Sequence, residues 1–139
     1  MTLANRSIRT LAWLGDAELE LEVRRRLSAR GDYPTDRLDA MKAELVCAPR
    51  QAALLAEIEG ALTEAEADVV RRGRNADIGA KSRSRTDVKT HRSATALEAL
   101  VAHWVIAGQR ARFEALLVPA LESAIDDAMK RLATKPRRG

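Results

Sequence analysis

The sequence is poor in cysteine, proline and aromatic residues. Its 139 residues include one cysteine, four prolines, two tryptophans, one tyrosine and one phenylalanine. A lone cysteine excludes a disulfide framework and a cysteine-rich zinc site, and a chain of this length buries a core without such links. We therefore expect a single globular domain in a reducing, intracellular compartment.

Long apolar runs are also missing. The longest candidate, residues 99–108, is interrupted by His103 and is far shorter than the ~18 apolar residues of a membrane-spanning helix. Residues 1–16 contain no apolar stretch of signal-peptide length before the first charged residues. These absences predict a soluble, cytoplasmic protein.

Charge of one sign is concentrated in two segments. The formal net charge is only +4, but eight lysines or arginines lie between Arg71 and Arg92, against Asp77 and Asp87. The last ten residues add five bases and no acid, so the rest of the chain is acidic. This asymmetry indicates a polyanionic partner that meets one face of the protein.

Apolar residues recur at helical spacing, and the sequence has no alternating strand pattern, internal repeat or phosphate-binding loop. The spacing predicts an all-α fold. Gly31 and Pro34 should end the first helical segment, Pro49 should lie in the first turn of the third, and Thr63 with Glu66 forms a capping-box pattern. The expected helical segments are 8–29, 35–46, 50–59, 64–74, 93–108 and 110–132.

The remaining residues are expected to be irregular. Residues 75–92 contain few apolar side chains and are expected to form a long loop, which in a small domain is usually functional or disordered. Residues 133–139 are expected to form a disordered basic tail, so that one domain spans residues 1–132.

Two carboxylates lie where an acid needs an explanation. Glu98 is in the middle of the most apolar segment, and Asp16 directly follows Gly15. Buried carboxylates are normally paired or metal-bound. Glu98 could equally face solvent, and Asp16 could be a helix N-terminal acid that complements the macrodipole. If the two helices pack together, the acids would converge on Mg²⁺ or Mn²⁺, and such a site hydrolyses phosphodiesters.

Other pairings of residues are weaker candidates. Cys47 with His91 or His103 could form a nucleophile and base, but Cys47 and His103 are more typical of packed core residues. Trp13 and Trp104 occupy apolar helical positions and are expected in the core rather than as platforms for stacking bases.

Particular segments resemble a known family. Residues 11–20 (LAWLGDAELE) resemble the signature helix of ribonuclease III catalytic domains, and residues 96–100 (ALEAL) resemble their second acidic motif. Residues 72–76 (RGRNA), 86–88 (TDV) and 90–100 (THRSATALEAL) are similar to the Mini-III ribonucleases. These are dimeric catalytic domains without a double-stranded-RNA-binding domain. The similarity covers roughly residues 3–117.

The resemblance implies an all-helical endonuclease, a homodimer with a valley between its subunits, and Mg²⁺-dependent cleavage of double-stranded RNA, with Mn²⁺ able to substitute. It also implies a role in maturing the precursor of large-subunit (23S) ribosomal RNA. By position, Asp16 and Glu98 match the catalytic acids that hold the metal. Glu20 matches a further acid of the signature, and we assign it, with Thr95, a supporting role.

The chain departs from the larger ribonucleases III at three acidic positions. Arg9, Ala12 and Thr95 stand where those enzymes have acids, as in Mini-III members, so one Mg²⁺ per site is favoured over two. His91 stands where the family suggests tyrosine, and its effect is open.

The basic segment would then bind the RNA duplex through phosphate and ribose contacts. Lys81 and Arg83 could equally be solvated loop charges. A catalytically inactive RNA-binding or ribosome-associated scaffold is the alternative, and a helical protein-interaction module is a third. The expected RNA-binding residues are Arg72, Arg74, Asn75, Lys81, Arg85, Lys89 and Arg92.

Overall fold

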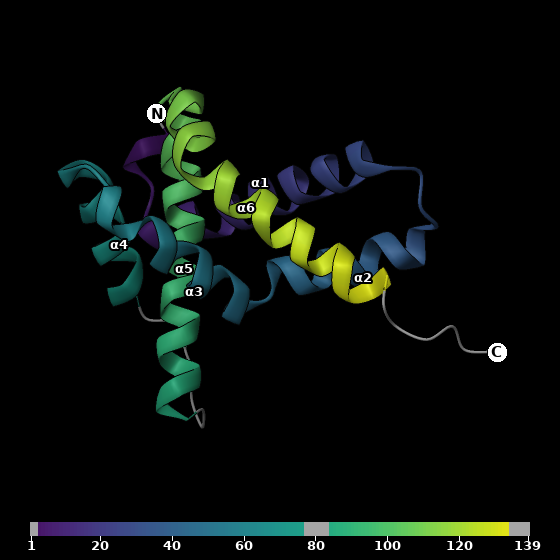
Figure 1. Ribbon diagram of the computed structural model, residues 1–139. Coiled ribbons are helices and arrows are strands. Elements are labelled where there is room, and N and C mark those ends of the chain that lie inside the picture. Colours follow the sequence, from purple (N-terminus) through teal and green to yellow (C-terminus); the bar gives the residue numbers. More distant parts are fainter. Residues whose placement is uncertain (1–2, 77–83, 134–139) are drawn as a thin grey trace.

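The structure is a computed structural model that describes residues 3–76 and 84–133, and this part of the chain is helical without a strand (Figure 1). The expected all-α class is confirmed. None of the described helices is long and apolar enough to cross a membrane. The elements are two 3-10 turns, Leu3–Asn5 and Glu59–Ala61, and the helices α1 (Ile8–Arg30), α2 (Thr35–Val46), α3 (Ala48–Ile58), α4 (Glu64–Asn75), α5 (Arg85–Ile106) and α6 (Arg110–Ala133).

Local capping chemistry explains where the helices begin. The hydroxyl of Ser7 accepts a hydrogen bond from the backbone N–H of Thr10 at 3.2 Å and caps α1. The predicted capping box is present at α4, where Thr63 and Glu66 each accept a hydrogen bond from the other's backbone N–H at 3.2 and 2.9 Å. Pro49 lies in the first turn of α3, as expected from its missing N–H donor.

Helix α5 begins earlier than the sequence pattern predicts. The expected loop over residues 75–92 is wrong for its second half, because α5 starts at Arg85 rather than near residue 93. The hydroxyl of Ser84 accepts a hydrogen bond from the N–H of Asp87 at 3.1 Å, and the Asp87 carboxylate complements the helix dipole. The first turns of α5 extend beyond α3 (Figure 1). Because they do not pack on the core, they carry no apolar stripe that would mark them as helical in the sequence. Residues 77–83 and 134–139, with most of the predicted tail, lie outside the described residues.

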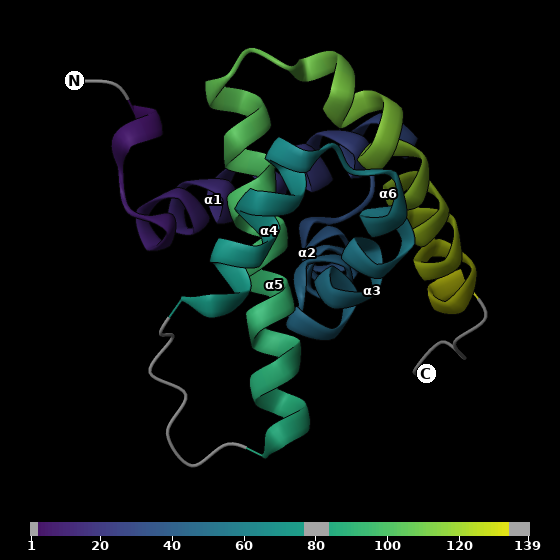
Figure 2. The ribbon, with the colours of Figure 1, turned by 90° about the vertical axis from the view of Figure 1, so that its left-hand side faces the viewer.

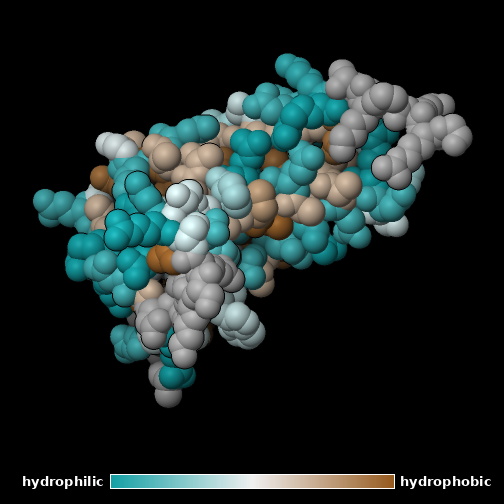
Figure 3. Space-filling model, turned by 90° about the horizontal axis from the view of Figure 1, so that it is seen from below, coloured by the Kyte–Doolittle hydropathy of each residue, from teal (hydrophilic) through white to brown (hydrophobic). Residues whose placement is uncertain are grey.

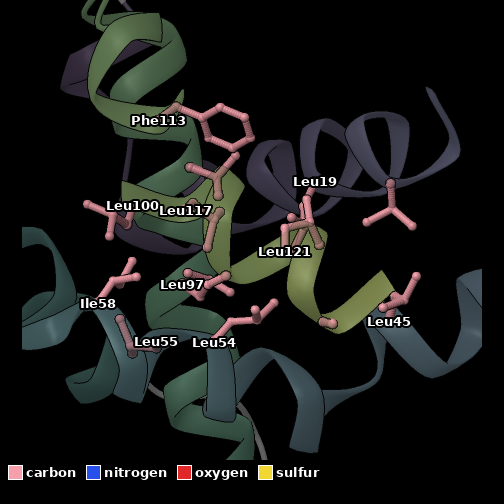
Figure 4. Packing of buried hydrophobic residues seen from close by; sticks show 14 of the residues in the cluster. Leu19, Leu45, Leu54, Leu55, Ile58, Leu97, Leu100, Phe113, Leu117 and Leu121 are labelled. Atoms are coloured by element: carbon pink, nitrogen blue, oxygen red, sulfur yellow. The ribbon is translucent and has the colours of Figure 1, made fainter. Parts of the chain in front are cut away.

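The core surrounds α5, which packs against α1, α3 and α4, while α6 packs on α2 and α3 (Figure 2). Leu97, Leu100 and Trp104 of α5 are fully buried. Figure 4 shows the side chains that converge there from α1, α2, α3 and α6. This arrangement holds the middle of α5, where Glu98 lies, rigidly against its neighbours.

Two residues expected in the core are exposed. Trp104 is buried as predicted, but Trp13 is 77% exposed. Helical spacing cannot distinguish a face that meets the core from an apolar face left outside it. Cys47 is also exposed, because it lies at the junction of α2 and α3 and its thiol is directed to the carbonyl of Glu44 at 3.4 Å.

A buried carboxylate ties α4 to α5 and α6. Glu66 is 2% exposed and accepts hydrogen bonds from the Trp104 indole at 2.7 Å and from Arg112 at 2.7 and 2.9 Å. Chiefly through the hydrogen bond from Arg112, these partners lower the pKa of Glu66 from 4.5 to about 2. The network therefore stabilises the fold in its charged form.

We expect this network to make unfolding sensitive to acid. A carboxyl with a lowered pKa contributes stability that is fully present above pH 4.5 and is lost as the pH falls towards 2. The free energy of unfolding should fall by about 3 kcal/mol over that window on account of Glu66 alone. Denaturant titrations of Glu66→Gln should show a flatter profile, while Glu64→Gln, an exposed neighbour, should behave as the unaltered protein. Equal pH profiles for both variants would contradict this role.

Candidate active site

Asp16 and Glu98 meet where α1 crosses α5. The two helices are in such close contact that a Cβ added to Gly15 would lie 1.7 Å from the carbonyl oxygen of Glu98. This close approach brings the two carboxyl groups within hydrogen-bonding distance of each other. Asp16 is exposed and Glu98 is half-buried. The structure thus joins two acids that are 82 positions apart in the sequence.

The structure removes the alternative interpretation of each acid. Asp16 cannot cap or complement the N-terminus of its helix, because α1 begins at Ile8, two turns earlier. Glu98 does not face open solvent, because its carboxyl is half-buried and hydrogen-bonded to Asp16. Both acids belong to a single polar site.

The electrostatics of the pair favour a bound proton or cation. Burial, together with the hydrogen bond and negative charge of Asp16, raises the pKa of Glu98 to about 8, while a hydrogen bond from Gln51 lowers it. Without a metal, the pair therefore holds a proton at pH 7. A divalent cation that displaces this proton neutralises both carboxylates.

The donor set fits a hard metal ion. The described residues contain no cluster of three or more histidine, cysteine, aspartate and glutamate side chains, so two carboxylates are the available ligands. Mg²⁺ and Mn²⁺ prefer oxygen donors, and Mg²⁺ commonly takes only one or two carboxylates and completes its shell with water and phosphate oxygens. A softer metal such as zinc would find no histidine or thiolate here.

Glu20 and Thr95 lie one turn from the acids but have other partners. Glu20 forms ion pairs with Arg24 at 3.1 Å and Lys42 at 3.6 Å. The Thr95 hydroxyl donates to the carbonyl of His91 at 3.0 Å within α5. The ion pair between Glu20 and Lys42 links α1 to α2, while the contacts with Arg24 and His91 stay within α1 and α5.

A basic groove lies between the end of α4 and the first turns of α5. Figure 2 shows where these two helix ends lie. The groove has a volume of about 530 Å³, and none of the described residues that line it is an acid. Figure 3 views the molecule from the end at which α5 begins and shows a mainly hydrophilic surface with interspersed apolar residues. The residues that line the groove are Arg74, Asn75, Arg85, Val88, Lys89, Arg92 and Ser93.

The groove gathers five of the seven residues predicted to bind RNA. Arg72 is exposed on α4 but does not line the groove, and Lys81, like Arg83, lies outside the described residues. Arg74 is bound by Glu59 through two contacts of 2.5 and 2.8 Å, so its charge is already compensated. Arg85, Lys89 and Arg92 follow at helical spacing on one exposed face of α5. Among the described residues that line the groove, these three have no ion pair with an acid and supply its positive charge.

The groove and the acidic pair share helix α5. Arg92 and Glu98 are separated by six residues, which corresponds to about 9 Å along a helix axis. Gly73 brings α4 against the backbone of Ala96, where an added Cβ would lie 2.7 Å from its Cα atom. The groove and the acidic pair thus lie within two turns of each other along α5, on different faces of the helix.

Sequence reasoning missed two features of the site region. Gln51 of α3 is 3% exposed and hydrogen-bonds to Glu98, and no motif singled it out. The second feature is the exposure of three large apolar side chains, Trp13 and Leu21 on α1 and Val105 on α5, which are 77%, 45% and 44% exposed. The spacing of Trp13, Ala17 and Leu21 in steps of four residues marks this stripe on α1.

The sequence is similar to those of known proteins. Residues 9–109 match the ribonuclease III domain family. The chain is 42% identical over 113 residues to a protein named Mini-ribonuclease 3 from Symbiobacterium thermophilum, covering 81% of this chain and 86% of the relative. It is 45% identical over 103 residues to the protein of that name from Desulfitobacterium hafniense, covering 74% of this chain and 64% of the relative.

A solved structure shares the fold. The crystal structure of protein FN1578 from Fusobacterium nucleatum superposes with a TM-score of 0.75 at 24% sequence identity. The match covers 86% of this chain and 94% of that chain.

Proposed function

The chain belongs to the ribonuclease III family, within its Mini-ribonuclease 3 branch, and on this premise we propose that it cleaves double-stranded RNA with Mg²⁺ held by Asp16 and Glu98. The family membership makes the protein an endoribonuclease of a divalent-metal-dependent family that acts on double-stranded RNA. The identity of the metal and the roles of individual residues are the proposed part. The observation that carries them is the hydrogen-bonded pair of carboxyl groups at the crossing of α1 and α5.

The chemistry follows from the charges in the site. Mg²⁺ bound to the pair would activate a water molecule and stabilise negative charge on the phosphate that is attacked. Glu98 is half-buried and Asp16 is exposed, so the pair is accessible to a substrate from the side of Asp16. With two protein ligands, we propose one ion per site, with Mn²⁺ as a substitute.

The basic groove is proposed to hold the RNA backbone. Double-stranded RNA is recognised mainly by shape, through phosphate and 2′-hydroxyl groups, which suits a groove of arginine, lysine and asparagine side chains. Arg85, Lys89 and Arg92 are proposed to contact phosphates. Arg74, whose charge is compensated by Glu59, is proposed to position the end of α4 and the Asn75 amide beside them.

We expect the double variant Lys89→Gln, Arg92→Gln to bind RNA more weakly, and we expect its RNA affinity to depend less steeply on salt concentration. Each lost phosphate contact should lower the slope of log affinity against log salt by roughly 0.7–0.9. Titrating a labelled RNA duplex at several salt concentrations, in EDTA to prevent cleavage, measures this slope. Arg25→Gln, an exposed change on α1 away from the groove, serves as the control. An unchanged slope in the double variant would exclude the groove as the RNA site.

The physiological substrate is proposed to be the precursor of 23S ribosomal RNA. This assignment is supported by the resemblance to the Mini-III ribonucleases and by the similarity to proteins of that name. Incubation with precursor transcripts that carry the paired ends of 23S RNA, followed by mapping of the new termini, tests it. Cleavage of unrelated duplexes at equal rate would oppose a dedicated role.

A homodimer is the assembly that suits the apolar stripe on α1. Trp13, Leu21 and Val105 are exposed in the single chain, and a large exposed apolar patch commonly marks an interface. We expect Trp13→Ala to raise the dissociation constant of the dimer by about 30-fold or more, which is the loss typical of a tryptophan at the centre of an interface. Light scattering over a range of protein concentrations measures it, with circular dichroism to confirm an unchanged helix content. A parent protein that is monomeric throughout would refute the dimer.

An inactive RNA-binding or ribosome-associated scaffold is the second candidate. The thin set of acids in the site favours it, since the described residues bring two carboxylates together there. The retention of both Asp16 and Glu98 opposes it, because carboxylates beside a polyanion weaken binding unless a cation lies between them.

A further inference from the structure

Gln51 is a buried polar side chain next to the acidic pair. It lies on α3, which packs directly against α5, and only 3% of its surface is exposed. Its Nε2 atom donates a hydrogen bond to the carbonyl of Val46, the last residue of α2, at 2.9 Å. Its Oε1 atom is buried and has no hydrogen-bond partner in the described structure.

The hydrogen bond to Val46 fixes which way the amide points. A carbonyl oxygen can only accept a hydrogen bond, so the Nε2 atom of Gln51 must face the Val46 carbonyl. The second N–H of Nε2 remains available for another acceptor. The amide acts on Glu98, because it favours the charged form of that carboxyl and so lowers its pKa. Asp16 and Gln51 thus approach the same carboxyl group of Glu98 from two different helices.

Packing alone does not account for this residue. A buried acceptor without a partner is destabilising, and an apolar side chain of similar volume would avoid that cost. The bond to Val46 connects α2 and α3, but these helices are already joined directly in the chain. An apolar residue would lose both the hydrogen bond to the Val46 carbonyl and the interaction with Glu98.

We propose that Gln51 is a positioning residue that holds the Glu98 carboxylate towards Asp16, so that both acids can bind one divalent cation. This inference deepens the proposed function, because it rests on Asp16 and Glu98 as the metal site. Gln51 acts through Glu98 and does not itself touch the metal or the RNA. Residues that orient a metal ligand typically contribute about 10–100-fold to metal affinity.

The test replaces Gln51 by an unbranched apolar residue of similar length, Gln51→Met. Thermal unfolding is measured in EDTA and then over a titration with Mn²⁺, and cleavage of a labelled RNA duplex is measured over a titration with Mg²⁺. We expect the Tm in EDTA to stay within about 2 °C of the unaltered protein, because removal of the unpartnered acceptor offsets the loss of the hydrogen bond to Val46. The Mn²⁺ and Mg²⁺ concentrations at half effect should rise by about tenfold or more.

The controls distinguish a failure of the proposed role of Gln51 from a failure of the proposed metal site. Gln109→Met makes the same chemical change at an exposed glutamine and should alter neither the Tm nor the metal midpoints. Gln51→Leu repeats the test with a different apolar shape. Unchanged metal midpoints would overturn the inference, as would a fall of several degrees in EDTA for both variants. Metal-dependent cleavage that survives Glu98→Gln would instead refute the proposed metal site.

Discussion

Replacing Glu98 by glutamine is expected to lower the rate of RNA cleavage by on the order of 10³-fold, because the metal contribution to a phosphodiester transition state is worth several kcal/mol. Glutamine has nearly the same shape and keeps an oxygen that can accept a hydrogen bond, but it carries no negative charge for the cation. Asp16→Asn should have a comparable effect. The rate is measured by single-turnover cleavage of a labelled duplex in saturating Mg²⁺.

The same substitution should not harm the fold or the binding of RNA. Charging Glu98 is unfavourable in the metal-free protein, as its pKa of about 8 shows, so a neutral amide removes a cost rather than a stabilising charge. We therefore expect the Tm of Glu98→Gln in EDTA to equal or exceed that of the unaltered protein, with RNA affinity retained. Full cleavage activity in either acid variant would refute the assignment of the site.

Replacing Gly15 by alanine is expected to destabilise the protein severely. In the interior of a helix such a change normally stabilises by up to ~1 kcal/mol, because alanine is the better helix former. Here the new Cβ would lie 1.7 Å from the carbonyl oxygen of Glu98, and both atoms belong to rigid helices. Separating α1 from α5 should cost about 3 kcal/mol, at the upper end of the usual range for overpacking, and this reverses the sign of the effect.

Chemical denaturation measures this cost, and two other glycines provide a scale. Gly60→Ala has nothing within 4 Å of its added Cβ and should change stability by less than ~0.5 kcal/mol. Gly73→Ala, whose Cβ would lie 2.7 Å from the Cα of Ala96, should fall between the two. Because a wider crossing also separates Asp16 from Glu98, Gly15→Ala should lose cleavage even where it remains folded. Equal stability of the Gly15 and Gly60 variants would contradict the close crossing.

Local signals in the sequence predicted most helix boundaries, and the main miss has a physical cause. The capping box at Thr63 and the proline in the first turn of α3 depend on neighbouring residues only, so they were readable. The start of α5 was not, because residues 85–92 form a helix without a core-facing stripe. Ser84 three residues before Asp87 was the available signal.

The sequence could predict the acidic pair only on the condition that the helices carrying Asp16 and Glu98 pack together. The sequence marked Asp16 and Glu98 as unusual acids, but whether they meet depends on how α1 crosses α5, which is a tertiary property. Gln51 could not be identified, since an isolated glutamine in a helical segment carries no signal until its burial is known. The exposure of Trp13 likewise depends on which face of α1 the core leaves uncovered.

The most direct test of the central claim is the cleavage of a labelled RNA duplex by the purified protein, in Mg²⁺ and in EDTA, at low and moderate salt. We predict internal cuts that require the metal and disappear in the Glu98→Gln variant. A duplex that stays intact in Mg²⁺ but is shifted in a binding gel would contradict the enzyme mechanism and favour the scaffold.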